Sequence, residues 1–235
     1  MPSSASERHK ASLRNEFLIT SRDNEKLKLV RKLHERRWRE KLGLFFCEGE
    51  DLVAAATAEP VELLVAGENV EAELLAEVST AGHPPRVIGV FRREDLPAAE
   101  PGPVALALWR VADPGNVGTL IRTAGAFGAA VALSDGCADP TGPKAVRASA
   151  GAIWTVPLLP ISNLHHKRVA LVAHGGVPVE EADLSGEVAF LLGAEREGLP
   201  ADVARDLEVT IPIDTESLNV AAAGAIALHE WRRRR

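Results

Sequence analysis

A strand that leads through a glycine-containing turn into a helix is the feature that most limits how this chain can fold. Residues 104–111 (VALALWRV) are mainly apolar and predict a buried strand, which the Asp-Pro-Gly sequence at 113–115 ends. Small residues recur from there to Gly128 and predict a helix that another backbone or a ligand can approach closely. Asn116 lies near the start of this helix, and Arg122 follows six residues later.

Two further strands end in the same way. Residues 188–192 (VAFLL) run directly into Gly193-Ala194-Glu195, and residues 209–213 (VTIPI) lead into Ser217-Leu218-Asn219 ahead of an alanine-rich helix. Strands short and apolar enough for a parallel sheet covered by helices on both faces are expected at 104–111, 130–133, 168–173, 188–192 and 209–213. We therefore predict an α/β fold here.

One crossover in this sheet is unusually short. Between Leu158 and Lys167 there are too few residues for the full helix that a parallel connection normally contains. The covering helix there is expected to be very short or missing.

The N-terminal part predicts a second, smaller α/β domain. Apolar residues recur near helical spacing among lysines and arginines from Asn24 to Lys41, which predicts one amphipathic basic helix. Strands are expected at 44–47, 61–65 and 86–90, and helices at 49–58 and 72–79. The proline-containing segment 92–103 is the best boundary. We predict a flexible segment 1–15, a small domain 16–97 and a larger domain 104–235.

The charge of the chain is unevenly distributed. The formal net charge is −6, yet residues 1–41 carry +6, residues 232–235 carry +4, and the remainder carries −16. Phosphate backbones respond to local clusters of Lys and Arg, so these ends suit nucleic acid. Charge alone is equally compatible with a solvated basic helix and an ordinary basic tail.

Composition excludes several other classes of protein. No apolar run approaches the roughly 20 residues that a membrane-spanning helix needs, and the first ten residues lack the apolar core of a secretory signal. The two cysteines, Cys47 and Cys137, form no C-x-x-C pair and predict neither a disulfide framework nor a zinc site. A cytoplasmic protein without a metal is expected.

Together the three turns resemble the motifs of the SpoU/TrmH class of SPOUT RNA methyltransferases. Members carry N-x-x-x-x-x-R, then G-x-E, then S-L-N, and the matching residues in this chain are Asn116 and Arg122, Gly193 and Glu195, and Ser217, Leu218 and Asn219. The middle residue of the second motif is often Asn, whereas this chain has Ala194, which removes one amide group. The resemblance covers roughly residues 104–230.

The resemblance implies an enzyme that transfers a methyl group from S-adenosylmethionine to a ribose 2′-hydroxyl of RNA. It also implies a C-terminal trefoil knot and a cofactor held largely by main chain, at Leu192, Gly193, Ile211 and Leu218. Ligands of open α/β sheets usually bind beyond the ends of the strands, where these residues lie. A sulfonium brings its own leaving group, so the enzyme mainly positions the reactants and needs no metal.

The residues predicted to take part in catalysis are Asn116, Arg122, Glu195, Ser217 and Asn219. A guanidinium keeps its proton at ordinary pH, so we interpret Arg122 as orienting the hydroxyl and stabilising the charge that develops on it. Asn116 is expected to position the ribose and brace its loop. Structural interpretations stay open: Arg122 pairs with Glu195 or lies at a dimer interface, and Ser217 and Asn219 suit a helix N-cap.

RNA contacts are expected in both parts of the chain. The segment 139–151 resembles D-P-x-x-P-K-x-x-R-A-S of the class, which assigns Lys144 and Arg147 to phosphate; the alternative is a solvated helix face. Arg36 and Arg37 of the basic helix are expected to contact RNA. The sequences at 19–24 and 45–49 resemble a small RNA-holding domain found ahead of many catalytic domains of the class.

A homodimer is also expected. The helices at 116–127 and 217–228 present small and apolar residues, which favour association, and the resembled class dimerises so that both subunits shape each site.

Three functions compete on this sequence. The leading hypothesis is methylation of 23S ribosomal RNA, with transfer RNA as the alternative substrate, because an extra domain precedes the catalytic one. The second is an RNA-binding protein that keeps the fold without turnover. The third, a nucleotide-dependent oxidoreductase, is disfavoured because no G-x-G-x-x-G follows a strand with an acidic residue about 20 positions further on.

Overall fold

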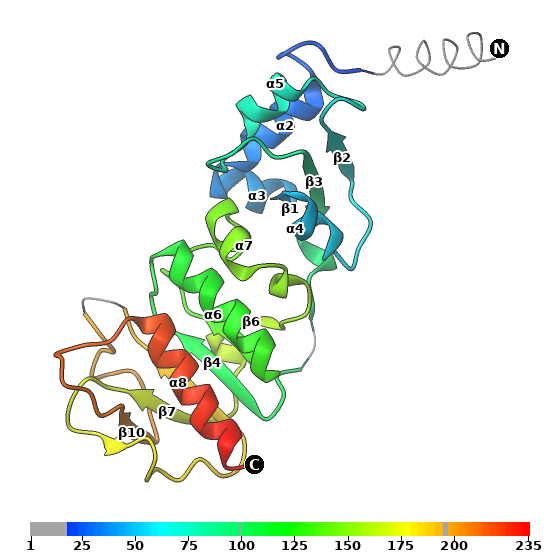
Figure 1. Ribbon diagram of the computed structural model, residues 1–235. Coiled ribbons are helices and arrows are strands. Elements are labelled where there is room, and N and C mark those ends of the chain that lie inside the picture. The colour runs from blue at the N-terminus through cyan, green and yellow to red at the C-terminus, as the bar shows by residue number, and fades with distance from the viewer. Residues whose placement is uncertain (1–17, 99, 195–196) are drawn as a thin grey trace, which may run out of the picture. The chain divides into compact units, whose positions relative to one another are not determined.

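The computed structural model describes residues 18–98, 100–194 and 197–235, and these form two compact units, one that ends at Asp95 and one that begins at Leu96. Figure 1 shows the helices and strands of each unit, which are described separately below. The predicted flexible segment 1–15 lies outside the described residues.

The N-terminal unit is built on a three-stranded antiparallel sheet. Its strands lie in the order β1 (Leu44–Glu48), β3 (Val87–Arg92) and β2 (Glu62–Val65). Its helices are α2 (Glu25–Leu33), α3 (Arg36–Leu42), α4 (Glu50–Ala54) and α5 (Ala72–Val78), and the short 3-10 helix η1 spans Arg93–Asp95. The strands expected at 44–47, 61–65 and 86–90 and the helices expected at 49–58 and 72–79 are therefore present; β1 and β3 are one residue longer than expected, whereas β2, α4 and α5 are shorter.

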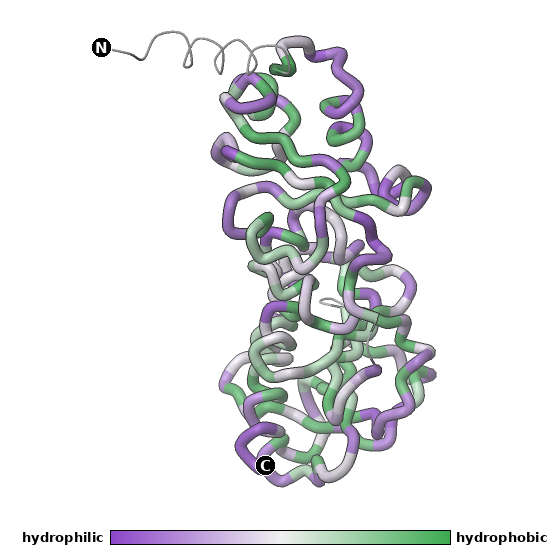
Figure 2. Tube along the Cα trace, turned by 90° about the vertical axis from the view of Figure 1, so that its right-hand side faces the viewer, coloured by the Kyte–Doolittle hydropathy of each residue, from purple (hydrophilic) through white to green (hydrophobic). Residues whose placement is uncertain are grey.

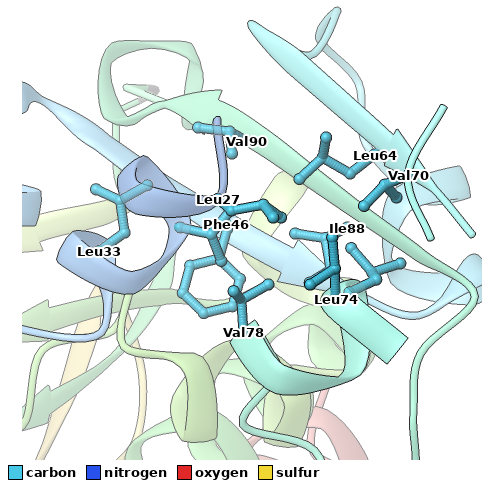
Figure 3. Close-up of a cluster of buried hydrophobic side chains, with 11 residues drawn as sticks. Leu27, Leu33, Phe46, Leu64, Val70, Leu74, Val78, Ile88 and Val90 are labelled. Carbon is cyan, nitrogen blue, oxygen red and sulfur yellow. The ribbon is translucent and has the colours of Figure 1, made fainter. Parts of the chain in front are cut away.

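The core of this unit lies between the sheet and the helices α2 and α5. Leu27 of α2, Phe46 of β1, Val78 of α5 and Ile88 of β3 belong to one buried cluster, whose side chains converge in Figure 3. Figure 2 shows apolar residues along the strands of this unit and polar residues on many of its loops. Burial of such side chains, at about 1.5–3 kcal/mol each, supplies most of the stability of a small domain.

The prediction of one continuous helix from Asn24 to Lys41 is wrong, because the chain breaks between α2 and α3. Glu35 at the break has an extended backbone (φ −94°, ψ 132°). Nη1 of the buried Arg39 donates hydrogen bonds to the carbonyl oxygens of Leu33 and His34, both at 2.8 Å. These contacts satisfy carbonyl groups that the break leaves without helical partners. The helical spacing of apolar residues in the sequence gives no indication of these Arg39 hydrogen bonds.

The C-terminal unit contains a seven-stranded sheet, and all its pairings are parallel. The strands lie in the order β6 (Leu158–Pro160), β5 (Ala130–Leu133), β4 (Val104–Leu108), β9 (Val188–Leu192), β7 (Lys167–Leu171), β10 (Leu207–Thr210) and β8 (Val177–Pro178). The predicted α/β fold with a parallel sheet is confirmed. The trefoil knot stays a prediction.

Helices cover one face of this sheet. The α-helices of the unit are α6 (Pro114–Phe127), α7 (Pro143–Ser149) and α8 (Val220–Arg233), and Figure 1 shows α6 and α8 running beside each other over the strands. Gly224 of α8 allows this packing, since a Cβ atom there would lie 2.5 Å from Cδ2 of Leu120 in α6 and 3.1 Å from Cδ1 of Leu192 in β9.

We expected helices on both faces of the sheet, but the opposite face does not follow this prediction. In the part of the chain that the structure describes, its cluster of small strand residues packs against loop side chains such as Leu164 and Val203. The 3-10 helices are η2 (Ala152–Trp154) and η3 (Ile161–Asn163), and η3 is the connection from β6 to β7. The expectation that this crossover holds at most a very short helix is confirmed.

Helices α6 and α7 pack closely because Gly118 has no side chain. A Cβ atom at Gly118 would lie 2.3 Å from the carbonyl oxygen of Ala145 and 2.6 Å from Cβ of Ala148. Real atoms do not approach so closely, so a larger residue would push α7 away from the start of α6.

We predict that Gly118→Ala lowers the free energy of unfolding by about 1–3 kcal/mol, because overpacking outweighs the gain in helix propensity. Gly125→Ala is the matched control on the same helix: its Cβ would lie 3.2 Å from side-chain atoms of Ala152 and Val156, a contact that small shifts relieve. Urea unfolding of both variants measures the difference. Equal midpoints would contradict the packing described.

Candidate functional site

The turns that follow β9 and β10 enclose a cavity together with the start of α8. This central cavity has a volume of about 440 Å³, within the range of small-molecule sites. Side chains from β7, from the turns and from α8 line it, including Leu171, Ala173, Leu192, Gly193, Ala194, Ile211, Ile213, Ser217, Leu218 and Asn219. The cavity lies at the carboxyl ends of parallel strands, where ligands of open α/β sheets usually bind.

The central cavity gathers the residues predicted to bind a cofactor. Leu192, Gly193, Ile211 and Leu218 all line it, and so do Ser217 and Asn219 from the third motif. The walls are mainly apolar side chains and glycine, which suits an adenine ring and the carbon chain of a methionine. The cofactor roles of these residues stay predictions, but the fold brings all of them to one place.

Gly193 is required by the shape of its own turn. A Cβ atom there would lie 2.3 Å from the carbonyl carbon of Gly198 and 2.5 Å from its oxygen. The turn closes through the Gly198 N–H, which donates to the carbonyl oxygen of Ala194 at 2.9 Å, and Gly198 has a left-handed backbone (φ 65°). The predicted catalytic residue Glu195 lies outside the described residues.

Asn116 and Asn219 meet side chain to side chain. Nδ2 of Asn219 donates to Oδ1 of Asn116 at 3.2 Å, and Oδ1 of Asn219 accepts from the N–H groups of Ala221 (2.9 Å) and Ala222 (3.3 Å). Asn219 is thus the N-cap of α8 and a bridge to α6. The N-cap interpretation is therefore correct for Asn219, and it is compatible with a second role in the site.

A second hollow adjoins the central cavity on the α6 side. This Asn116 hollow has a volume of about 550 Å³ and is lined by Arg110, Ala112, Asp113, Asn116, Gly136, Ala194 and Glu197. Ala194 lines both spaces. A molecule in the central cavity and a second molecule in the Asn116 hollow would therefore be neighbours, as a group transfer between them requires.

Asp113 organises the start of α6. Its Oδ1 accepts from the Asn116 N–H at 3.0 Å, and its Oδ2 accepts from Nζ of Lys144 at 2.9 Å. The hydrogen bond from Lys144 is the main reason that the pKa of Asp113 is below its ordinary value. Lys144, predicted to bind phosphate, is thus held by a carboxylate at the edge of the Asn116 hollow, while Arg147 is half-buried on α7.

Arg122 is not brought together with the other predicted site residues. It is exposed on α6 and lines neither the central cavity nor the Asn116 hollow. Within the described residues its guanidinium makes no hydrogen bond or ion pair. One chain by itself therefore does not place this group at the site.

Arg36 and Arg37 lie on α3 of the N-terminal unit, where each pairs with a glutamate. Nε of Arg36 lies 2.7 Å from Oε1 of Glu40, and Nε of Arg37 lies 2.7 Å from Oε2 of Glu35. The half-buried Trp38, the next residue along α3, has three cations over its ring, from Lys32, Arg37 and Lys41, at 5.6, 5.5 and 5.1 Å from the ring centroid.

Sequence reasoning missed Arg110 and Gly136, which both line the Asn116 hollow. They follow β4 and β5, and this position beyond the end of a parallel strand is the signal that would have pointed to them. No group of three or more His, Cys, Asp or Glu side chains in the described ranges is placed to hold a metal ion. Across those ranges, no helix is long and apolar enough to span a membrane.

Comparison with known proteins agrees with this geometry. Residues 103–229 match the model of the SpoU rRNA Methylase family, and residues 24–90 match an MRM3-like substrate binding domain. A 23S rRNA guanosine 2′-O-methyltransferase of Bacillus subtilis is 33% identical over 91% of this chain and 98% of its own length. An uncharacterized tRNA/rRNA methyltransferase of Synechocystis is 31% identical, over 92% and 93%.

Solved structures give the same answer. The rRNA methyltransferase of Sinorhizobium meliloti, solved with bound S-adenosylmethionine, superposes with a TM-score of 0.81 at 28% identity, covering 92% of this chain and 97% of that one. A SpoU methyltransferase of Streptomyces viridochromogenes, also solved with the cofactor, gives 0.78 at 25% identity, covering 90% and 98%. This chain therefore belongs to the SpoU rRNA methylase family of RNA methyltransferases that use S-adenosylmethionine.

Proposed function

We propose that this enzyme methylates a ribose 2′-hydroxyl, and that its substrate is 23S ribosomal RNA. The observation that carries the proposal is the contact between two spaces: the central cavity and the Asn116 hollow share Ala194 and are bridged by the Asn116–Asn219 hydrogen bond. The relative from Bacillus subtilis, which matches nearly end to end, is named for this reaction on 23S rRNA.

The residues of the central cavity fit S-adenosylmethionine. Leu192, Ile211 and Leu218 offer apolar surface to the adenine ring, and Gly193, which lines the cavity without a side chain, would let its main chain approach the polar edge of that ring. When bound, the cofactor would supply a methyl group on a sulfonium, whose neutral thioether leaves without help from a metal, while the proton of the ribose hydroxyl passes to water or phosphate. What remains for the protein is to hold the ribose hydroxyl in line with that methyl group.

Asn116 and Asn219 are suited to hold the ribose. The Asn116 amide lies at the wall of its hollow, and its orientation is set by the bond from Asn219 and by Asp113 at the start of α6. An amide can both donate to and accept from a ribose hydroxyl. Ser217, on the same rim, can contact cofactor or ribose.

Arg122 supports a homodimeric site. It is exposed and unpaired within the described residues, and Gly125 and Ala126 beside it are exposed as well. On α8, Ile226 leaves 39% of its surface exposed. We propose that α6 and α8 pack against a second copy, which brings Arg122 of one subunit to the Asn116 hollow of the other. There its guanidinium would stabilise the charge that develops on the attacking oxygen.

Mapping the 2′-O-methyl sites in RNA from cells with and without this protein tests the proposed substrate. A site in 23S rRNA that disappears with the protein supports the proposal. A lost site confined to transfer RNA would contradict it and favour the alternative substrate, which is compatible with the Synechocystis relative, a tRNA/rRNA methyltransferase.

We predict that Arg122→Ala lowers the single-turnover rate of methyl transfer by about a hundredfold or more, as the loss of one preorganised donor does elsewhere. The dissociation constant for S-adenosylmethionine should not change, because Arg122 does not line the central cavity. Arg122→Lys should recover little, since an ammonium lacks the planar fork. Transfer from labelled cofactor, with calorimetry alongside, gives both values; an unchanged rate in Arg122→Ala would assign this residue a structural role.

We predict that two inactive variants restore activity when mixed. Arg122→Ala lacks the group given to the partner, and Leu218→Glu blocks the central cavity. After subunit exchange, half of the dimers are mixed and each has one intact site, so about one quarter of the original activity should return. Sedimentation of the unaltered protein should show a dimer. A species of 25.1 kDa alone, or no recovery on mixing, would contradict the dimeric site.

We predict that the basic surface around Trp38, formed by the end of α2 and by α3, contributes to RNA affinity and not to cofactor affinity. Lys32 and Lys41 lie over Trp38, and the variant Lys32→Gln/Lys41→Gln removes both charges while the glutamate pairs of Arg36 and Arg37 remain. RNA affinity should fall, and the slope of log K against log salt should decrease by about two. Glu50→Gln/Glu59→Gln is a control for altered charge elsewhere in this unit. An unchanged salt slope would show that RNA does not contact this surface.

A further inference from the structure

Arg110 has a backbone conformation that an arginine rarely adopts. Its φ is 54°, in the left-handed region, and Ala150 is the other such non-glycine residue in the described ranges. A left-handed residue with a Cβ atom costs about 1–2 kcal/mol, and such strain persists only where the surroundings enforce it. It tends to cluster at functional sites.

Two neighbouring contacts enforce this conformation. The Arg110 N–H donates to Oγ of Ser134 at 2.9 Å, which ties the residue to the turn after β5. Gly136 in that turn, also left-handed (φ 87°), leaves room for the arginine: a Cβ there would lie 3.3 Å from Nε of Arg110 and 3.4 Å from its Cγ. The hydrogen bond fixes the backbone of Arg110, and the absence of a side chain at Gly136 leaves room for the arginine side chain beside this turn.

That place is the wall between two hollows. Arg110 and Gly136 line the Asn116 hollow, and they also line a third space, the Trp109 hollow, of about 420 Å³. The other residues of the Trp109 hollow are Trp109, Ser134, Asp135 and Ile161. Within the described residues, nothing hydrogen-bonds or pairs with the exposed guanidinium of Arg110.

Among the described residues that line these two hollows, Arg110 is the only lysine or arginine. The carboxylates of Asp135 and Glu197 lie in the same linings, and Asp113 is paired with Lys144. A phosphate passing from one hollow to the other would therefore meet repulsion on several sides and attraction at Arg110. A guanidinium binds phosphate oxygens through two parallel hydrogen bonds, which also sets the orientation of the chain.

We propose that Arg110 binds the phosphate that joins the methylated nucleotide to its neighbour, and that the Trp109 hollow receives this neighbouring nucleotide. The proposal rests on the function proposed above, since it takes the methylated ribose to lie in the Asn116 hollow. The Trp109 hollow is large enough for a nucleobase, and Trp109 and Ile161 give it apolar surface. Arg110 is then a positioning residue, which places the ribose without touching the reacting atoms.

Arg110→Gly and Arg110→Asn separate this role from a structural one. Both replacements accept a left-handed backbone, so the thermal midpoint should stay the same or rise. Binding of a short, fluorescein-labelled single-stranded RNA of mixed sequence is measured by anisotropy in a salt series. We expect both variants to bind this RNA roughly tenfold more weakly or worse, because the charge-assisted hydrogen bonds of the guanidinium are lost, with a salt slope smaller by about one.

Two further variants complete the experiment. Ile161→Glu adds a carboxylate to the Trp109 hollow and should also weaken RNA binding. Arg168→Gln removes one positive charge from the amino-terminal end of β7, whereas the hollows lie beyond the carboxyl ends of the strands, and it should leave RNA affinity unchanged apart from general screening. With the unmethylated form of the RNA that the enzyme modifies as substrate, Arg110→Gly should raise KM and leave kcat at saturating RNA unchanged.

The outcomes are distinct. RNA affinity and salt slope unchanged in both Arg110→Gly and Arg110→Asn would overturn the proposal, and so would a fall in kcat at saturating RNA with no change in KM. Failure of the unaltered protein to methylate 23S rRNA would contradict the proposed substrate instead, because the binding measurement does not depend on which RNA is methylated.

Discussion

The hydrogen bond between the side chains of Asn116 and Asn219 is the contact on which the rest of the site depends. It joins residues 103 positions apart and ties the first turn of α6 to the N-cap of α8. Both helices begin beyond the carboxyl ends of parallel strands. The hydrogen bond therefore holds together the two turns that lead from these strands into the helices. The central cavity and the Asn116 hollow become neighbours as a result, and a methyl donor and an acceptor ribose can meet.

Close packing at three glycines supports this contact. Gly118 lets α7 approach α6, Gly224 lets α8 approach α6, and Gly193 lets its turn fold back on Gly198. A Cβ atom at Gly118 or Gly193 would collide with backbone atoms, and one at Gly224 would have to displace the end of the Leu120 side chain. The two asparagines can meet at 3.2 Å because the helices that carry them are held this closely, whereas larger residues would widen the site.

The strands and the cofactor residues could be predicted, for different reasons. Short apolar runs such as Val188–Leu192 are buried on both faces of a parallel sheet, so hydropathy located them directly. Leu192, Gly193, Ile211 and Leu218 were assigned by family resemblance, and the fold gathers them around one cavity. The break between α2 and α3 could not be read from helical spacing, because it depends on contacts of Arg39. Arg110 was missed because a sequence does not display a left-handed φ.

A crystal structure with S-adenosylhomocysteine, the product form of the cofactor, tests the central claim most directly. This account predicts that the molecule fills the central cavity, with its adenosyl group against Leu192, Ile211 and Leu218, and that its sulfur faces the Asn116 hollow past Ala194. The Asn116–Asn219 hydrogen bond should persist. A product bound away from this cavity, or one whose sulfur is separated from the Asn116 hollow by protein, would contradict the account.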